Sequence, residues 1–266
     1  MSRDIIAIGD VHGDGERLFS AMTRLGLISK SGVWTGGSTN LVILGDVVDG
    51  LPRTDQYFVS MMGDVAALEF LDEIAKQAER VGGAVTRLLG NHEHFALAGV
   101  HNYVHPADMS RAGGDEQRHR LFQPGGKAFK ALAAWKYVHV ENRTVFCHAG
   151  ISTVAAAKLR DVDAVRNAED HVTLPHILEH RQYAEDSGDP DAIATLRAML
   201  TRAGCRSMVI GHNTVQVPVT IWDGLVTLAD CGLSRAFRAP GHMYAICVRP
   251  NGTQETIVIR SSPDAA

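Results

Sequence analysis

Short apolar runs alternate with amphipathic stretches along the first half of the chain. The runs at residues 5–9, 41–45 and 84–89 predict strands. Between them, residues 65–81 carry apolar side chains at the spacing of an amphipathic helix, and residues 14–27 predict a second helix. Strands that alternate with helices are typical of βαβ units, so this half of the chain predicts an α/β fold.

The second half of the chain has more hairpin character. Asp223-Gly224 is a strong two-residue turn signal between two apolar stretches. The strand pairs predicted here are residues 137–141 with 144–148, 217–222 with 225–230, and 243–249 with 254–260. The helices predicted here are at about 174–186 and 191–203, before a further strand at 207–211. Together the two halves predict two sheets packed against each other with helices outside.

We expect residues 1–266 to form a single domain, because no linker, repeat or low-complexity segment divides the chain. The stretch at about 99–126 shows no clear periodicity and carries several histidines and arginines, which predicts a long loop. Loops of this length are usually functional or disordered. This one is either a solvated excursion or a lid that helps to select substrate. We expect residues 261–266 to form a frayed tail.

Composition and charge exclude several classes of protein. A hydrophobic fraction of 45% and a charged fraction of 21% are ordinary for a globular protein. The net charge of −4 gives no general attraction to nucleic acid or to an anionic membrane, so we expect neither as a partner. No run approaches the ~20 apolar residues of a membrane-spanning helix, and residues 5–8 are too short for a signal-peptide core. A cytoplasmic location is therefore expected.

The four cysteines give no sign of a disulfide or a zinc site. They are Cys147, Cys205, Cys231 and Cys247, and no Cys-x-x-Cys pair occurs among them. We expect them to be buried, reduced thiols. Cys147 precedes His148 in an extended segment, so the two side chains should point to opposite faces of the strand.

Five short motifs place polar side chains directly after the apolar runs. They are Gly9-Asp10-Val11-His12-Gly13, Gly45-Asp46-Val47-Val48-Asp49, Gly90-Asn91-His92-Glu93, His148-Ala149-Gly150 and Gly211-His212-Asn213. Side chains from separate strands converge at the carboxyl ends of strands in an α/β sheet. The glycines allow the backbone to turn sharply and to approach a ligand closely.

These motifs supply the ligands of a two-metal site. The candidate ligands are Asp10, His12, Asp46, Asn91, His148 and His212. Oxygen and imidazole ligands without thiolate suit Mn²⁺, Fe or Zn²⁺. One motif alone would be weak evidence, because an Asp-x-His is often surface and Asn91 is a good helix N-cap. Two ions ~3.5–4 Å apart can activate a bridging water, so the five motifs together predict phosphate-ester hydrolysis.

The motifs resemble those of the calcineurin-like metallophosphoesterases, and within them the phosphoprotein phosphatase family. Similarity to the Shewanella-like branch extends beyond the five motifs. The further residues that carry it are Leu89, Asn102-Tyr103-Val104, Phe146-Cys147, Thr214-Val215-Gln216 and Asp230-Cys231-Gly232-Leu233-Ser234. The resemblance covers roughly residues 4 to 249. It implies a four-layer αββα sandwich, in which two central mixed sheets are flanked by helices.

The resemblance also implies a role for each matched position. The ligands it implies are Asp10, His12 and Asp46 for one metal ion, and Asp46, Asn91, His148 and His212 for the other, with Asp46 bridging. His92 would be the general acid that protonates the leaving oxygen, and Asp49 would orient it. An imidazolium held by a carboxylate can stay protonated near neutral pH, which suits this role. The expected cofactors are two divalent ions, with Mn preferred over Fe or Zn.

The chain departs from the family pattern after Asp49. The family usually continues with Arg-Gly, and that arginine grips the substrate phosphate, but here Gly50 follows. Either Arg53 reaches back into the site or that contact is missing. Arg181 matches a second phosphate-binding arginine of the branch, and a guanidinium binds phosphate in a bidentate manner. Arg53, Arg181 and Asn91 are therefore the candidate phosphate-binding residues.

Three functions remain open at this point. The first is a metal-dependent phosphomonoesterase that acts on phosphorylated Ser, Thr or Tyr side chains. The second is a hydrolase of small phosphorylated metabolites or dinucleoside polyphosphates on the same scaffold, because a fold does not fix a substrate. The third is a binding module without catalysis, which the complete set of ligands and His92 disfavours. The sequence does not indicate an oligomeric state.

Overall fold

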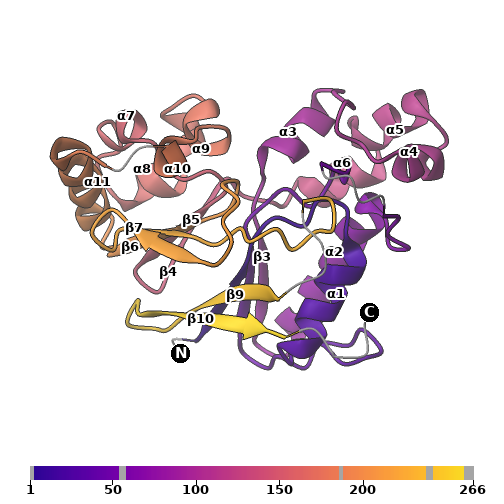
Figure 1. Ribbon diagram of the computed structural model, residues 1–266, viewed down its shortest axis with the longest axis horizontal. Helices are drawn as coiled ribbons and strands as arrows, with labels where there is room; N and C mark the ends of the chain where they lie inside the picture. The colour runs from indigo at the N-terminus through magenta and orange to yellow at the C-terminus, as the bar shows by residue number, and fades with distance from the viewer. Residues whose placement is uncertain (1–2, 54–57, 186–187, 238–241, 261–266) are drawn as a thin grey trace.

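Two five-stranded sheets lie at the centre of the chain (Figure 1). The structure, a computed structural model, describes residues 3–53, 58–185, 188–237 and 242–260. The first sheet has the strand order β10 (Gln254–Ile259), β9 (Met243–Val248), β1 (Ile5–Ile8), β2 (Asn40–Ile43) and β3 (Ala84–Arg87). The second has the order β4 (Val138–Glu141), β5 (Thr144–Cys147), β6 (Ser207–Ile210), β8 (Val226–Leu228) and β7 (Val219–Ile221).

Each sheet is mixed and contains three neighbouring parallel strands. β1, β2 and β3 run parallel, while β9 is antiparallel to both β1 and β10. In the second sheet β5, β6 and β8 run parallel, and β4 and β7 pair antiparallel at the two edges. The hairpins predicted around residues 142–143, 223–224 and 250–252 are therefore confirmed.

Side chains alternate between a central core and two outer cores. In β1, Ile5 and Ala7 point into the core between the sheets, and Ile8 points toward the helices. In β5, Phe146 points into the central core and Cys147 into the outer core of its sheet. This two-residue period is the geometry of a strand that is buried on both faces.

Helices cover the outer face of each sheet, which confirms the four-layer αββα sandwich. The helices over the first sheet are α1 (Gly15–Arg24), α2 (Asp64–Arg80) and α6 (Lys127–Leu132). The helices over the second are α7 (Thr153–Ala156), α8 (Val162–Arg166) and α11 (Pro190–Arg202), with the 3-10 turn η1 (Ala168–Asp170). Among the described residues, no helix is both long and apolar enough to cross a membrane.

The prediction of a loop over residues 99–126 is wrong in its secondary structure. This stretch contains α4 (Pro106–Ala112) and α5 (Asp115–Phe122), and it follows α3 (Asn91–Leu97). The buried face of α4 carries Asp108, and that of α5 carries Arg118 beside Phe122. Because polar residues occupy these buried positions, the apolar periodicity that would have indicated helices is absent.

The single helix predicted over residues 174–186 is also wrong. Two short helices, α9 (Pro175–Leu178) and α10 (Gln182–Glu185), stand in its place. The chain leaves the helical path between them, where Nε2 of His180 pairs with the carbonyl of Gly150 at 3.0 Å. Residue 186 and the tail at 261–266 lie outside the described residues.

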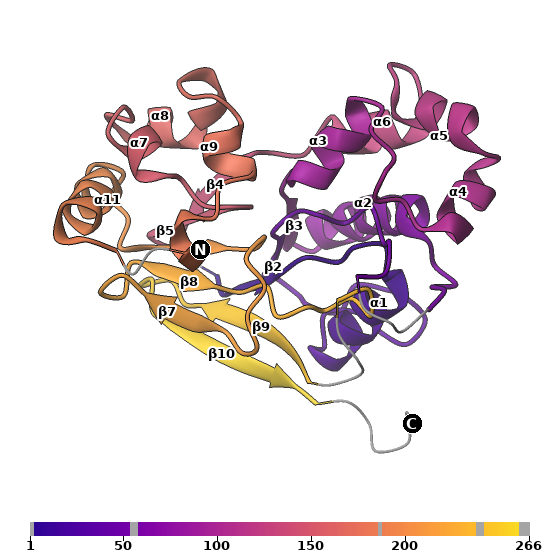
Figure 2. The same ribbon diagram turned by 45° about the horizontal axis from the view of Figure 1, so that its top comes forward.

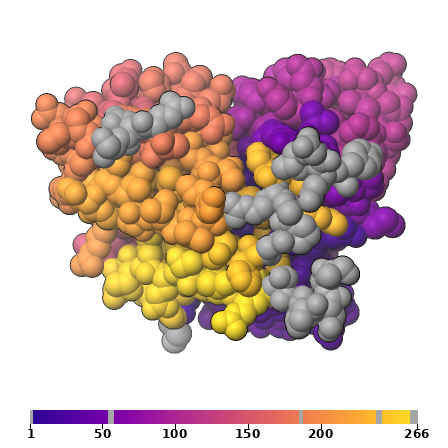
Figure 3. Space-filling model, in the orientation of Figure 1, coloured from indigo at the N-terminus to yellow at the C-terminus, as the bar shows by residue number. Residues whose placement is uncertain are grey.

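Two groups of helices lie above the sheets in the view of Figure 2. α3, α4, α5 and α6 lie together on the side of the first sheet, and α7, α8 and α9 lie on the side of the second. In the space-filling view the two halves of the chain lie side by side, with the yellow strands β9 and β10 below (Figure 3). The carboxyl ends of β1, β2, β5 and β6 therefore lie between these two groups of helices.

Candidate metal centre

A pocket of about 570 Å³ lies between the two helical groups. Its lining residues are Asp10, His12, Asp46, Arg53, Asn91, His92, Phe95, Tyr103, Glu179, Arg181, His212, Thr214 and Phe237. Asp10 follows β1, Asp46 follows β2 and His212 follows β6, so the strand ends bring them together as expected. His148, after β5, is fully buried and contacts Asp46.

The backbone is strained where it presents these side chains. His12 (φ 42°), Asp46 (φ 49°) and His212 (φ 60°) adopt the left-handed region that non-glycine residues rarely occupy. The carbonyl of Asp46 holds one of these turns by accepting the N–H groups of Val11 (3.0 Å) and His12 (2.8 Å). Strain of about 1–3 kcal/mol per residue persists where the surrounding contacts determine the geometry, which is typical of functional sites.

Gly90 is required by a close approach to Asp46. A Cβ atom at position 90 would lie 2.1 Å from Oδ1 of Asp46 and 2.5 Å from its backbone nitrogen. The turn that precedes α3 can therefore contact the Asp46 carboxylate only because this residue lacks a side chain.

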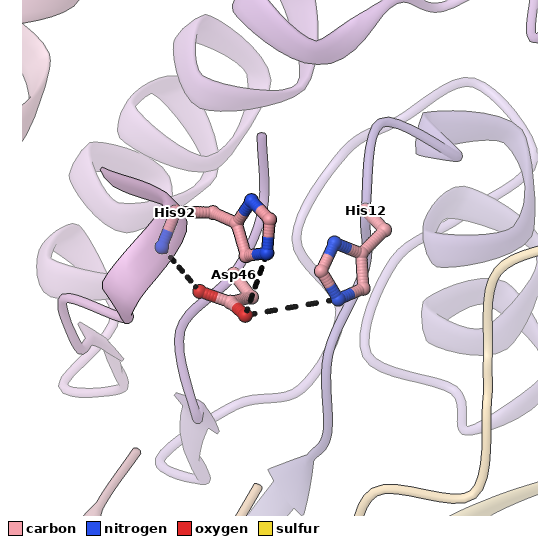
Figure 4. A group of neighbouring side chains, drawn as sticks. All are labelled: His12, Asp46 and His92. Carbon is pink, nitrogen blue, oxygen red and sulfur yellow. Dashed lines mark hydrogen bonds and ion pairs between the residues drawn. The ribbon is translucent and has the colours of Figure 1, made fainter. Parts of the chain in front are cut away.

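Asp46 is the carboxylate shared by two clusters of metal-ligating groups. One cluster is His12, Asp46 and His92, and the other is Asp46, His148 and His212. Oδ2 of Asp46 lies 3.2 Å from Nε2 of His148 and 3.7 Å from Nε2 of His12. In Figure 4 dashed lines join the carboxylate to the rings of His12 and His92, and its Oδ1 accepts the backbone N–H of His92 at 2.9 Å.

Asp10 and Asn91 complete the predicted ligand set. The Asp10 carboxylate lies 3.8 Å from Nε2 of His12 and accepts the N–H of His212 at 3.1 Å. Oδ1 of Asn91 lies 2.9 Å from Nε2 of His148. The structure thus gathers all six candidate ligands in one place, while the role of each as a ligand stays a prediction.

Neighbouring carbonyl groups fix how the imidazoles face the site. Nδ1 of His12 pairs with the carbonyl of Asp49 at 3.2 Å, and Nδ1 of His148 pairs with the carbonyl of Leu44 at 2.8 Å. Because a carbonyl can only accept, both rings carry a proton on Nδ1, and their Nε2 atoms face Asp46. Such outer hydrogen bonds are typical of metal-binding histidines.

The protonation of these groups suits a bound cation. Burial lowers the pKa of His12 and that of His212 to about 3, so both rings are neutral. Burial also lowers the pKa of His148, but the negative charges of Asp46 and Asp10 outweigh this effect and raise the pKa of His148 to about 10. A metal ion would replace that proton. The oxygen and imidazole donors therefore fit divalent metal ions. Burial raises the pKa of the neighbouring Cys147 thiol to about 12, so Cys147 stays protonated and does not offer a thiolate ligand.

His92 and Asp49 form a buried hydrogen-bonded pair beside the metal ligands. Nδ1 of His92 lies 3.0 Å from Oδ2 of Asp49. Burial lowers the pKa of His92, but the charge of Asp46 and the Asp49 hydrogen bond outweigh it, so the pKa of His92 is raised. The Nε2 atom faces the pocket, where a guanidinium nitrogen of Arg53 lies 3.1 Å away. A guanidinium can only donate, so Nε2 accepts from Arg53, and a cation at this contact disfavours His92 as a metal ligand.

The two arginines proposed from the sequence both lie in the wall of the pocket. The Arg53 guanidinium stacks 4.4 Å from the ring centroid of Phe237 and 5.6 Å from that of Tyr103. Arg181 lies near the carbonyl of His212, at 3.4 Å. A Cβ at Gly50 would lie 2.7 Å from the carbonyl oxygen of His12, so the local backbone excludes a side chain at the position of the family arginine. Phosphate binding by either arginine stays a prediction.

Sequence reasoning missed two buried supports of the site. Glu93 is fully buried and accepts the backbone N–H groups of Asp46 (2.8 Å), Val47 (2.7 Å), Val48 (3.0 Å) and Gly90 (2.8 Å). Its place at the end of the third motif was a usable signal. The second support is Arg118, fully buried on α5 against Asp49, and nothing in the local sequence indicated it.

The comparisons with known proteins agree with this geometry. The calcineurin-like phosphoesterase family matches residues 4–214 of the chain. An uncharacterised protein of Schizosaccharomyces pombe is 28% identical over 95% of this chain and 79% of its own length. Shewanella-like protein phosphatase 2 of Arabidopsis thaliana is 40% identical over 38% of this chain, but only 23% of its own length is covered.

The fold is also found among solved structures. The cold-active protein tyrosine phosphatase of a psychrophilic Shewanella species superposes with a TM-score of 0.73 over 96% of this chain and 80% of its own. At 19% identity, this likeness concerns the fold.

Proposed function

Because the chain belongs to the calcineurin-like phosphoesterase family, we propose that it is a protein phosphatase that hydrolyses phosphorylated side chains with two divalent metal ions. The observation that carries the proposal is the convergence of two buried histidine and aspartate clusters on the shared carboxylate of Asp46. The resemblance to Shewanella-like protein phosphatases supports the substrate class. We include Mn²⁺ as the preferred ion and a cytoplasmic location in the same proposal.

The ligands would divide between the two ions around Asp46. The residues that would hold them are Asp10, His12 and Asp46 on one side, and Asp46, Asn91, His148 and His212 on the other. The bound ions would polarise phosphoryl oxygens and lower the pKa of a water between them, which provides the nucleophile. The strained turns and their hydrogen bonds fix the positions of the donor atoms, which preorganises the site.

The residues around the ligands would bind the phosphate and protonate the leaving group. Arg53 and Arg181 each offer a guanidinium that can pair with two phosphate oxygens. His92 is held through Nδ1 by Asp49 and would donate the proton on Nε2 to the leaving oxygen. Arg53 now donates to that nitrogen, so a phosphate that draws Arg53 toward itself would free Nε2 to take up from water the proton that His92 then transfers.

The pocket wall suits an aromatic leaving group. The rings of Phe95, Tyr103 and Phe237 line the pocket, and Phe95 and Tyr103 stack at 5.9 Å between centroids. Aromatic rings pack well against one another at such distances. We therefore include phosphotyrosine as the preferred side chain in the proposal, with phosphoserine and phosphothreonine as weaker substrates.

The test is hydrolysis of p-nitrophenyl phosphate by the metal-free protein, titrated with Mn²⁺ and followed by a panel of phosphopeptides, nucleotides and dinucleoside polyphosphates. We expect metal-dependent turnover, preference for phosphopeptides, and a loss of about 10²- to 10⁴-fold in His92→Asn with unchanged metal content. Faster hydrolysis of the nucleotides would instead support the small-metabolite function. Absence of turnover at any metal concentration would overturn the proposal.

A further inference from the structure

Arg118 is a fully buried cation that the metal site itself does not use. It lies on α5, in the helical group that was expected to be a loop, and its guanidinium packs 5.1 Å from the ring of Phe122. Nη2 of Arg118 lies 2.6 Å from Oδ2 of Asp64 and 3.3 Å from Oδ1 of Asp49. Nη1 adds a second contact to Asp64 at 3.2 Å. One cation thus joins two buried carboxylates.

Both carboxylate oxygens and the backbone N–H of Asp49 are hydrogen-bonded. Its Oδ2 pairs with His92, its Oδ1 accepts from Arg118, and its backbone N–H donates to Oδ2 of Asp64 at 3.4 Å. Its own backbone is in the left-handed region, with φ 66°. Because an aspartate side chain has only two rotatable bonds, a hydrogen bond to each carboxylate oxygen fixes the plane of the group. The plane of Asp49 in turn fixes the tilt of the His92 ring.

Stability alone does not account for this arrangement. A buried ion pair contributes little net stability compared with well-packed apolar residues, because both charges lose their hydration. The chain nevertheless places Asp64, Arg118, Asp49 and His92 in one continuous line of hydrogen bonds from α2 through α5 to the pocket. The line ends at the ring nitrogen that faces the pocket, where orientation has the greatest effect on reactivity.

We propose that Arg118 is a positioning residue for proton donation, which holds the Asp49 carboxylate so that His92 directs Nε2 at the leaving oxygen. The inference rests on the proposed phosphomonoesterase function and adds a residue to it. Arg118 is fully buried and is not among the residues that line the pocket. Loss of Arg118 should slow proton transfer indirectly, through the side chains of Asp49 and His92.

Dependence on the leaving group separates this role from a structural one. A weakly basic leaving group such as 2,4-dinitrophenolate departs without a proton, whereas phenolate from phenyl phosphate needs one. Weaker positioning of the acid should therefore slow phenyl phosphate by about 30-fold and dinitrophenyl phosphate by less than about threefold, with KM nearly constant. Damage to the metal site or to folding would slow both substrates together.

Three variants make the comparison. Arg118→Met removes the cation and keeps most of the volume, and Arg118→Lys keeps the charge but cannot hold both carboxylates in a fork. Arg120→Met is the matched control, because Arg120 lies on the same helix in an exposed ion pair with Glu116. We expect the selective loss in Arg118→Met, a smaller loss with the same selectivity in Arg118→Lys, and none in Arg120→Met. If Arg118→Met does not fold, Arg118→Lys decides the question.

A double variant completes the test. Arg118→Lys combined with His92→Asn should be no slower than His92→Asn alone, because a misplaced acid costs nothing once the acid is gone. Equal losses on both substrates, additive losses in the double variant, or metal content that falls in step with activity would overturn the positioning role. A wild-type protein without metal-dependent turnover of any monoester would overturn the proposed function together with the inference.

Discussion

Arg235 binds two carboxylates that differ in burial, and this predicts unequal effects on stability when each is neutralised. Asp14 is fully buried and accepts three bonds from Arg235, from its backbone N–H (3.0 Å), Nε (2.8 Å) and Nη2 (2.7 Å). Glu16 is 40% exposed and accepts one bond from Nη2 at 2.7 Å. The two pairs share a cation, so their difference reports the combined effect of burial and of the number of hydrogen bonds.

The expected magnitudes follow from that difference. Asp14→Asn keeps an oxygen for the N–H of Arg17 at the start of α1, but turns an amide donor toward the donors of Arg235. Breaking a buried pair in this way costs about 3–5 kcal/mol, and the partial exposure of Arg235 favours the lower end, about 3 kcal/mol. Glu16→Gln removes an exposed pair and should cost less than about 1 kcal/mol.

Urea denaturation followed by circular dichroism measures both values. With a slope of about 3 kcal/mol per molar urea, Asp14→Asn should lower the midpoint by about 1 M, and Glu16→Gln by less than about 0.3 M. The slope should not change, since neither substitution alters the surface exposed on unfolding. If the two variants agree within about 0.5 kcal/mol, burial does not set the strength of these pairs and the reasoning is refuted.

Three further predictions concern the pocket and the far edge of the sheets. Arg181→Ala should raise KM for phosphate esters about tenfold, equivalent to about 1.4 kcal/mol, with kcat little changed; an unchanged KM in steady-state kinetics would place phosphate binding elsewhere. Gly90→Ala should reduce bound metal, measured by elemental analysis, because its Cβ would meet the Asp46 carboxylate; full metal content would contradict the close approach. The hydrogen bond from His139, aided by Asn40, lowers the pKa of Glu141 from 4.5 to about 2. Its folded-state pKa is depressed, so its contribution is present above pH 4.5 and is lost as the pH falls toward 2. Glu141→Gln should therefore destabilise the protein by about 1–2 kcal/mol at pH 7, allowing for partial exposure, and by about half as much or less at pH 3; equal destabilisation in urea titrations at both pH values would exclude this linkage.

Much of the fold could be predicted from local sequence pattern. The strands at residues 5–8, 40–43 and 144–147 and the helices at 15–24, 64–80 and 190–202 lie within a few residues of their predicted places. Apolar periodicity reports burial directly, and these elements bury apolar side chains. α4 and α5 bury Asp108 and Arg118 instead, so the same reasoning interpreted them as a loop.

The candidate site divides in a similar way. Ligands that follow strands converge because of the topology, so Asp10, Asp46 and His212 could be placed together from sequence alone. The contact between Asp49 and Arg118 joins residues 69 positions apart on different elements, and no local pattern encodes it. Arg53 could be named only as an alternative, because its reach depends on the stacking of its guanidinium against Phe237.

The left-handed backbone at His12, Asp46, Asp49 and His212 has a consequence for directed evolution. Each of these residues would be less strained as glycine or asparagine, so a library selected for thermostability alone should drift toward those residues at these four positions. The same drift would remove the functional side chains. Sequencing such a library would therefore report, position by position, how much stability this protein gives up for its active site.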